Sequence, residues 1–227
     1  RQMFGNATDM LGAAVSQADR DQTTLRGTFR LGMEMSPALI PFVELGYGRT
    51  WRDEEIDFSG LRRSGDEMRA SVGVAVNLSE KLNGEFSVGW LRQTFDDATL
   101  PDVDGLRWTA ALNWSPQVGT TVNAGLTTSI DGGSGGGGGS LLYSGTAGIT
   151  HEFSSRLTGT ATFGLALRDY AASSQNDVTL SGEVGATYWF NRMVGINGRA
   201  RHESVMSDDP LRETDTTTLL LGLRLQR

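Results

Sequence analysis

Apolar and polar residues alternate along most of the chain. In residues 68–78 the even-numbered positions hold Met, Ala, Val, Val, Val and Leu, and the odd-numbered ones hold Arg, Ser, Gly, Ala and Asn. The same alternation recurs in residues 82–90, 106–114, 160–167 and 218–225. A period of two places successive side chains on opposite faces of a β-strand, whereas a helix would scatter both kinds around its circumference. The pattern therefore predicts strands with one apolar face and one face of small and polar residues.

Short and long connections alternate between these strands. The midpoints of four short turns, Glu80, Gln117, Ser155 and Arg192, lie 37, 38 and 37 residues apart, so the repeating unit is a two-stranded hairpin. The intervening connections are longer, polar and acidic, and they lie at residues 16–22, 52–66, 94–104, 130–140, 169–177 and 204–215. Counting segments predicts about twelve strands, an even number, with both termini on the short-turn side.

This organisation indicates an all-β protein, an antiparallel up-and-down transmembrane β-barrel with short periplasmic turns and long extracellular loops. A propeller would need four strands per blade within such a period, and a soluble sandwich would not sort its loops by length onto opposite ends. Aromatic residues predict two interfacial girdles: Trp114, Phe153, Tyr188 and Phe190 beside short turns, and Trp51, Phe95, Tyr143 and Tyr170 beside long loops. Residues 1–15 alternate poorly, so we expect a weak first strand or a plug there.

Composition narrows the classes of partner and site. The 227 residues include no cysteine, two histidines and one lysine against nineteen arginines, with a net charge of −7. These counts exclude disulfides and cysteine-based zinc sites and disfavour any other metal site or a nucleic-acid partner. No apolar run approaches the roughly 18–20 residues of a spanning helix. The chain starts at Arg1 without a leader, so we expect a processed or trimmed product. We treat residues 1–227 as one domain, with 132–140 (GGSGGGGGS) as an artificial linker.

Several segments resemble one family of proteins. They are residues 36–49 (SPALIPFVELGYGR), 78–90 (LSEKLNGEFSVGW), 113–116 (NWSP), 150–153 (THEF) and the ending 221–227 (LGLRLQR). These runs resemble the putative β-barrel porin type 2 family of outer-membrane proteins, which is common in alphaproteobacteria. The resemblance implies a barrel in the bacterial outer membrane. Family members are generally longer, which implies that strands upstream of Arg1 are missing.

If the apolar rows face lipid, the opposite rows line the lumen. The candidate lumen residues are eight arginines and six glutamates: Arg26, Arg30, Arg69, Arg107, Arg168, Arg199, Arg201, Arg224, Glu34, Glu44, Glu85, Glu152, Glu183 and Glu203. We expect most of them to pair across the interior. The alternative is a charged ladder that guides an anionic solute or an acidic polysaccharide. The acidic long loops would repel anions or bind divalent cations that bridge lipopolysaccharide, although solvated loop charge is the simpler interpretation.

Three functions from different classes follow. The first is a passive porin-like channel or the outer-membrane component of polysaccharide export; the second is a sealed structural barrel that partners with an envelope or secretion assembly. The third and weakest is a lipid-modifying enzyme, suggested only by His151 close to Ser154 and Ser155. No catalytic constellation, cofactor or metal site is expected. The expected partners are outer-membrane lipid and lipopolysaccharide, with periplasmic or secretion-system proteins in the export and assembly hypotheses.

Overall fold

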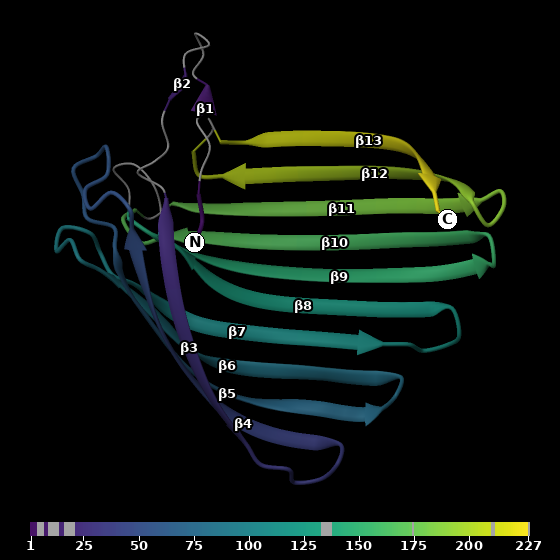
Figure 1. Ribbon diagram of the computed structural model, residues 1–227, viewed down its shortest axis with the longest axis horizontal. Helices are drawn as coiled ribbons and strands as arrows, with labels where there is room; N and C mark the ends of the chain where they lie inside the picture. The colour runs from purple at the N-terminus through teal and green to yellow at the C-terminus, as the bar shows by residue number, and fades with distance from the viewer. Residues whose placement is uncertain are drawn as a thin grey trace.

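The strands form one long antiparallel meander (Figure 1). The computed structural model describes residues 1–3, 7–8, 14–15, 21–132, 138–173, 175–209 and 212–226. Within these residues eleven strands pair strictly with their neighbours along the chain, in the order β13 to β3. The strands are β3 (Gln22–Gly32), β4 (Leu39–Arg52), β5 (Gly65–Ser79), β6 (Leu82–Phe95), β7 (Val103–Trp114), β8 (Thr120–Asp131), β9 (Ser140–Ser154), β10 (Leu157–Tyr170), β11 (Asn176–Trp189), β12 (Val194–Ser207) and β13 (Thr214–Leu225). The predicted all-β, up-and-down fold is confirmed.

The N-terminal segment does not supply the predicted twelfth strand in the residues described. β1 (Ala7–Thr8) and β2 (Ala14–Val15) pair only with each other, and the rest of residues 4–13 lies outside the described part. Gln2 makes one antiparallel bridge to Gln22. The main sheet therefore has eleven strands here, an odd number. β3 starts at the long-loop end, so the two edge strands, β3 and β13, run in the same direction, contrary to the prediction of both termini on the short-turn side.

Strand register defines two faces of the sheet. The polar face carries Glu44, which pairs with Ser71, and Gly89, which pairs with both Ser71 and Arg107. The apolar face carries the adjacent row of Val43, Val72, Val88 and Trp108. Because a strand alternates its side chains, every residue can be assigned to one of these faces by counting from those rows.

The apolar face is uncovered. Large apolar side chains that are exposed on it occur from one edge strand to the other, among them Leu25, Phe29, Leu45, Val72, Phe86, Leu106, Phe163, Val184, Leu219 and Leu223. Only five hydrophobic side chains of the described residues are buried. A water-soluble monomer rarely exposes so large a contiguous apolar surface, whereas a membrane-spanning sheet requires one.

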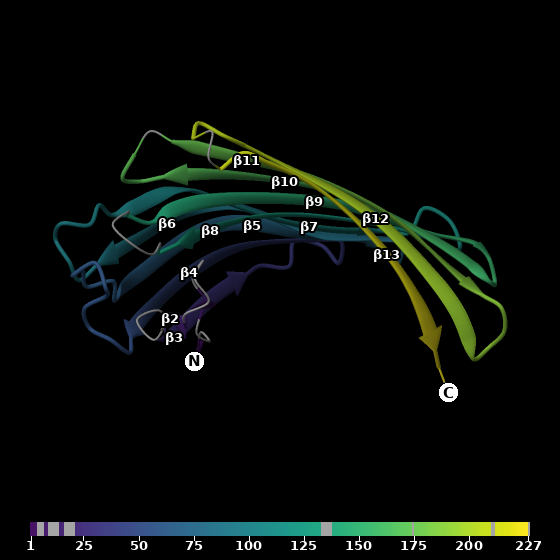
Figure 2. The same cartoon turned by 90° about the horizontal axis from the view of Figure 1, so that it is seen from above.

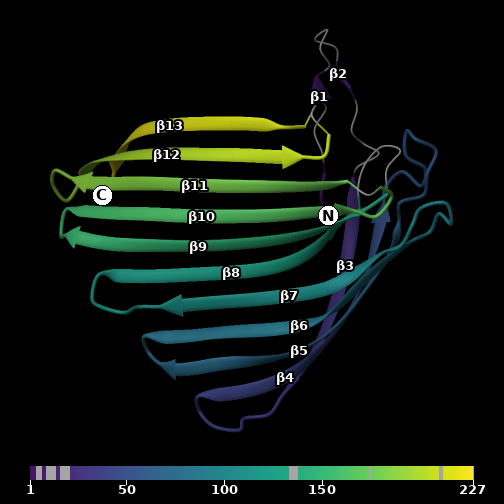
Figure 3. The ribbon, with the colours of Figure 1, turned by 180° about the vertical axis from the view of Figure 1, so that it is seen from behind.

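The sheet is curved and twisted, and it does not close on itself (Figures 1 and 2). The short turns gather at one end of the strands and the longer loops at the other (Figure 3). Side chains of the polar face reach one another across several strands, as described below, which shows that this face is the concave one. No helix in the described residues is long and apolar enough to cross a membrane.

The aromatic girdle is confirmed at one end only. Beside the short turns, Trp114, Phe153, Tyr188 and Phe190 are all exposed, and the first three lie on the apolar face. Of the four aromatic residues predicted beside the long loops, only Trp51 is both exposed and on the apolar face. Phe95 and Tyr170 fall on the polar face by register, and Tyr143 packs against a buried cluster. The prediction of a second girdle is wrong for Phe95 and Tyr170 because alternation along the strand, rather than proximity to a loop, decides which face a ring takes. It is wrong for Tyr143 because this ring, although on the apolar face by register, packs against the buried cluster.

Candidate functional site: the charged polar face

Thirteen of the fourteen candidate lumen residues share the polar face. Register places all of them on it except Glu34, which lies between β3 and β4, outside any strand. Those thirteen are Arg26, Arg30, Glu44, Arg69, Glu85, Arg107, Glu152, Arg168, Glu183, Arg199, Arg201, Glu203 and Arg224. These thirteen residues therefore share one face of the sheet, and that this face lines a lumen stays a prediction.

Arg30 is held most firmly. Its two terminal nitrogens donate to the two carboxylate oxygens of Glu85 at 3.0 and 2.7 Å. Its guanidinium carbon lies 3.4 Å from the ring centroid of Phe42, and Phe42 is itself 4% exposed. A Cβ on Gly73 would collide with this ring, so the absence of a side chain at Gly73 makes room for it. Arg30 thus combines a forked ion pair with a cation–π contact.

Phe42 was not identified by the sequence analysis. Phe42 lies two residues before Glu44 on the same strand, so the two side chains share the polar face. This spacing is the signal in the sequence that could have identified it. Glu67 was missed in the same way: it shares the face and accepts hydrogen bonds from Arg26 and Arg69, each at 3.1 Å.

Further pairs cross the same face between strands β3 and β7. Arg107 lies 3.6 Å from a carboxylate oxygen of Glu44, with both side chains largely covered, and donates to the Ser71 hydroxyl at 3.0 Å. Arg69 donates to the Thr28 hydroxyl at 2.5 Å. The partners come from strands two or three apart, so the side chains converge over the strands between them.

The strands β8–β13 carry a looser set of pairs. Arg168 donates to Asp131 at 2.9 Å, and Arg199 lies 3.4 Å from Glu183. Arg201 pairs with Glu203 on its own strand at 2.5 Å. Within the described part of the chain the remaining three candidates, Glu34, Glu152 and Arg224, make no ion pair. Most of the candidate charges therefore lie in ion pairs within the described sheet, while pairing across a closed interior stays a prediction. Because these pairs keep contact with solvent, each is worth little in stability and can exchange partners.

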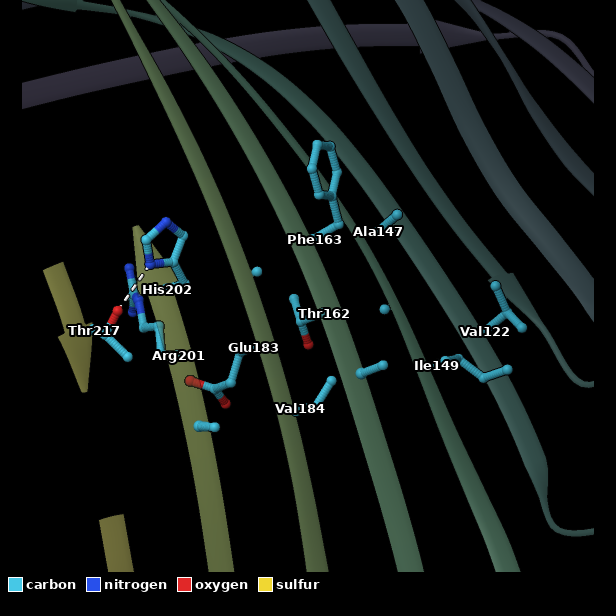
Figure 4. A pocket seen from close by; sticks show the side chains of 14 residues that line it. Val122, Ala147, Ile149, Thr162, Phe163, Glu183, Val184, Arg201, His202 and Thr217 are labelled. Carbon is cyan, nitrogen blue, oxygen red and sulfur yellow. Dashed lines mark hydrogen bonds between the residues drawn. The ribbon is translucent and has the colours of Figure 1, made fainter. Parts of the chain in front are cut away.

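An apolar cavity lies elsewhere, over strands β8–β13. It is a shallow, open hollow of about 560 Å³ lined partly by exposed side chains, and a row of facing residues contributes much of its lining: Val122, Ile149, Ala161, Val184 and Ala200 (Figure 4). At one end the Nδ1 atom of His202 lies 2.9 Å from the Thr217 hydroxyl. These residues belong to the apolar face, so the cavity is separate from the Arg–Glu pairs of β3–β7.

The suggested serine–histidine site is not assembled. The Ser154 hydroxyl accepts hydrogen bonds from the turn amides of Arg156 and Leu157, and His151 contacts the Thr120 hydroxyl and the edge of Phe153 instead. The described residues also contain no group of three or more His, Asp or Glu side chains arranged to hold a metal ion.

The chain matches a known protein family over its whole given length. The family model described as putative beta-barrel porin 2 matches residues 1–227. The chain belongs to this porin family. Among the curated proteins, no match to this porin-family chain is found.

Solved structures support the barrel fold of this porin-family chain. The FrpB iron transporter of Neisseria meningitidis, in its F5-1 variant apoprotein form, matches 82% of the chain with a TM-score of 0.57 and 10% identity. The F3-3 variant of the same transporter matches 86% with a TM-score of 0.55 and 10% identity. The matched regions cover 37% and 36% of those proteins, so the chain spans little more than a third of their length. The description of the family as a β-barrel porin points to the bacterial outer membrane.

Proposed function

We propose that the chain lines a passive, porin-like channel for small hydrophilic solutes across the outer membrane. The observation that carries this proposal is the concave polar face, on which arginines and glutamates are paired across strands. A protein wall facing water can hold such charges, whereas the same charges facing lipid would each cost several kcal/mol, roughly 2–4 for an arginine at the midplane. The exposed apolar face is suited to contact with outer-membrane lipid and lipopolysaccharide.

The near balance of charge on this face predicts the character of the channel. Arg30 faces Glu85 and Arg107 faces Glu44, so anions and cations meet similar fields. Opposed rows of charge orient a passing dipole and favour neither ion strongly. We therefore expect weak ion selectivity in the unaltered protein.

Polysaccharide export and a sealed structural barrel are the competing functions. Exposed aromatic rings would suit the passage of a sugar chain, but the Phe42 ring of the polar face is covered by Arg30. A sealed barrel would need its interior filled. On the concave face of the described strands the side chains of Arg26, Arg199 and Arg201 instead remain about half exposed. We therefore favour the small-solute channel.

Single-channel recording in planar bilayers tests the proposal. Discrete openings with weak selectivity under a salt gradient support a passive channel. Persistent silence at all voltages, from protein that is folded by circular dichroism, would establish the sealed barrel. A current that is blocked by an anionic polysaccharide but not by its monomer would favour export.

A further inference from the structure

Four asparagines face one another on successive strands of the sheet. Asn77 of β5 pairs with Asn83 of β6, Asn83 pairs with Asn113 of β7, and Asn113 pairs with Asn123 of β8. Register places this set on the polar face, since Asn113 follows Arg107 by an even number of residues on the same strand. Each asparagine lies within four residues of the short-turn end of its strand. We call these four residues the amide row.

The side chains of the amide row do not satisfy one another. The Nδ2 atom of Asn113 donates to the Oδ1 atom of Asn83 at 3.3 Å, and among the described residues this is the only hydrogen bond made by the four side chains. All four residues are exposed. An asparagine side chain has one acceptor oxygen and two N–H donors, and an amide ladder that served only to hold strands together would bond each amide to the next. Most of these donors and acceptors therefore face solvent.

Small residues leave room around the amide row. Three of the adjacent polar-face positions toward the long loops have at most a methyl side chain: Ala75, Ala111 and Gly125. On β9 the residue opposite Asn123 is Gly148. A Cβ at Gly148 would lie 2.5 Å from the Oδ1 atom of Asn123 and 3.6 Å from the Thr162 hydroxyl. The absence of a side chain at Gly148 therefore leaves the Asn123 amide open beside a further hydroxyl group.

The wall around the amide row is almost free of charge. On β5–β8, the polar-face positions from Ser87 and its facing residues to the short-turn ends of the strands hold only glycine, alanine, serine, threonine and asparagine, apart from Glu85. Both carboxylate oxygens of Glu85 accept hydrogen bonds from Arg30. An ion therefore finds little to attract it at the amide row. A neutral solute can exchange its hydrogen bonds with water for hydrogen bonds to the amides.

The chemistry of the amide row suits a solute with several hydroxyl groups. A side-chain amide presents an acceptor and donors next to each other, and a hydroxyl group both donates and accepts, so two neighbouring hydroxyls can bond to one amide. Neighbouring strands are about 4.8 Å apart, so the four amides extend over roughly 14 Å and can engage one solute at several points. Each new bond replaces a bond to water, so binding is weak, and weak binding allows a solute to leave a channel again.

We propose that the amide row is a binding site for neutral, polyhydroxylated solutes such as small saccharides, on the inner wall near the short-turn mouth of the channel. This inference rests on the proposed channel function. It deepens that function by naming a class of solute and by assigning its recognition to uncharged amides rather than to the ion pairs of β3–β7.

NMR of asparagine side chains tests binding without reference to conduction. The protein is labelled with nitrogen-15 at asparagine, held in a detergent without a sugar headgroup, and titrated with maltotriose. The side-chain amide signals of the amide row should shift and saturate. The signal of Asn197 should not, because this residue shares the polar face but lies opposite Thr187 and Gly222. Polyethylene glycol of similar size, whose ether oxygens cannot donate, should cause no saturable shift. Absence of a saturable shift with maltotriose, or an equal shift at Asn197, would overturn the proposal.

Block of the ion current tests the role of the amide row in the channel. Maltotriose in the bath should reduce the single-channel current in a saturable manner. Asn83→Leu and Asn113→Leu keep the size of the side chain and remove its hydrogen bonds, so each should weaken the block by about two- to tenfold. Asn197→Leu is the matched control and should leave the block unchanged. If a leucine variant does not fold, as judged by circular dichroism, the alanine variant of the same residue replaces it.

The outcomes separate the two proposals. A conducting wild type that maltotriose blocks no better than polyethylene glycol, or whose block is weakened equally by Asn197→Leu and Asn113→Leu, overturns the binding site and leaves the channel standing. Amide signals that saturate with maltotriose in a protein that never conducts overturn the channel and support the binding site. A silent protein without saturable shifts overturns both.

Discussion

Arg30 and Glu85 form a two-pronged ion pair although two strands, β4 and β5, lie between their own strands. Neighbouring strands are about 4.8 Å apart, so three steps would separate these residues by roughly 14 Å on a flat sheet. The pair closes because the sheet curves toward its polar face and because both side chains are long. Phe42 fills the space beneath the guanidinium. Curvature, an aromatic support and a forked pair together fix one positive and one negative charge in a defined place.

Removing one charge of this pair should make the channel selective. In Glu85→Gln the Arg30 guanidinium keeps its contact with the Phe42 ring but loses its two hydrogen bonds to the Glu85 carboxylate. The local electrostatic field therefore becomes positive. We expect the reversal potential under a salt gradient to move toward the anion value. Arg30→Gln should move it toward the cation value.

Glu80→Gln is the matched control for that experiment. It removes the same charge from the turn between β5 and β6, outside the strands. A reversal potential that shifts equally in Glu80→Gln and Glu85→Gln would show that net charge, rather than the pair, sets selectivity.

A side chain at Gly73 should disturb the same place indirectly. Its Cβ would lie 2.5 Å from the carbonyl oxygen of Phe86 and 2.7 Å from the Cβ of Ser87, in addition to meeting the Phe42 ring. Gly73→Val is therefore expected to destabilise the fold by about 1–3 kcal/mol, as overpacking usually does. Urea titration in lipid vesicles measures this. Gly182→Ala is the control, because nothing lies within 4 Å of its Cβ, and a similar loss there would contradict the steric explanation.

The sequence could predict which residues share a face because alternation is a local property. Strands β4 to β13 follow the hydrophobic pattern, and the charged rows follow with them. Which charges meet is decided elsewhere: Arg30 reaches Glu85 only through curvature of the whole sheet. Likewise, Leu141 alternates like any lipid-facing residue, yet it packs against Leu91 and Val103 of the polar face, beyond the point where the β7–β8 ladder ends. Tertiary geometry of this kind leaves no trace in a period-two pattern.

The assignment of faces predicts opposite tolerance at two adjacent residues. Val74 lies on the apolar face, and Ala75 lies on the polar face directly across from Glu85. Val74→Arg should cost on the order of 2–4 kcal/mol of membrane-folded stability, because it brings a charge toward hydrocarbon. Ala75→Arg should cost much less, since the new guanidinium would stay in contact with water and lie beside the Glu85 carboxylate. Equal losses in vesicle unfolding experiments would refute the assignment of inside and outside.

Asp57 should stay ionised to unusually low pH. Burial raises the pKa of this carboxyl, but hydrogen bonds from Arg63 and from the backbone N–H groups of Leu61 and Ser59 outweigh burial and leave the pKa below its ordinary value. A carboxylate with a lowered pKa stabilises the folded loop above the unfolded value of about 3.9, and that contribution is lost as pH falls through the folded pKa.

Amide resonances report this titration directly. The NMR shifts of Leu61 and Ser59 should be constant from neutral pH to about pH 5 and should change with a midpoint below the ordinary aspartate value. In Asp57→Asn both shifts should lose this step. A midpoint at or above the ordinary value would show that burial, rather than Arg63, dominates at this carboxyl.

The two ends of the sheet should be accessible from opposite sides of the outer membrane. Glu54, in the loop between β4 and β5, and Glu80, in the turn between β5 and β6, are both exposed acids at opposite strand ends. Since the chain has no cysteine, Glu54→Cys and Glu80→Cys each introduce a single thiol of known position. Outer-membrane barrels place long loops outside and short turns in the periplasm. A bulky, membrane-impermeant maleimide should therefore label Glu54→Cys in intact cells, and Glu80→Cys only after the outer membrane is permeabilised. The reverse pattern would invert the orientation.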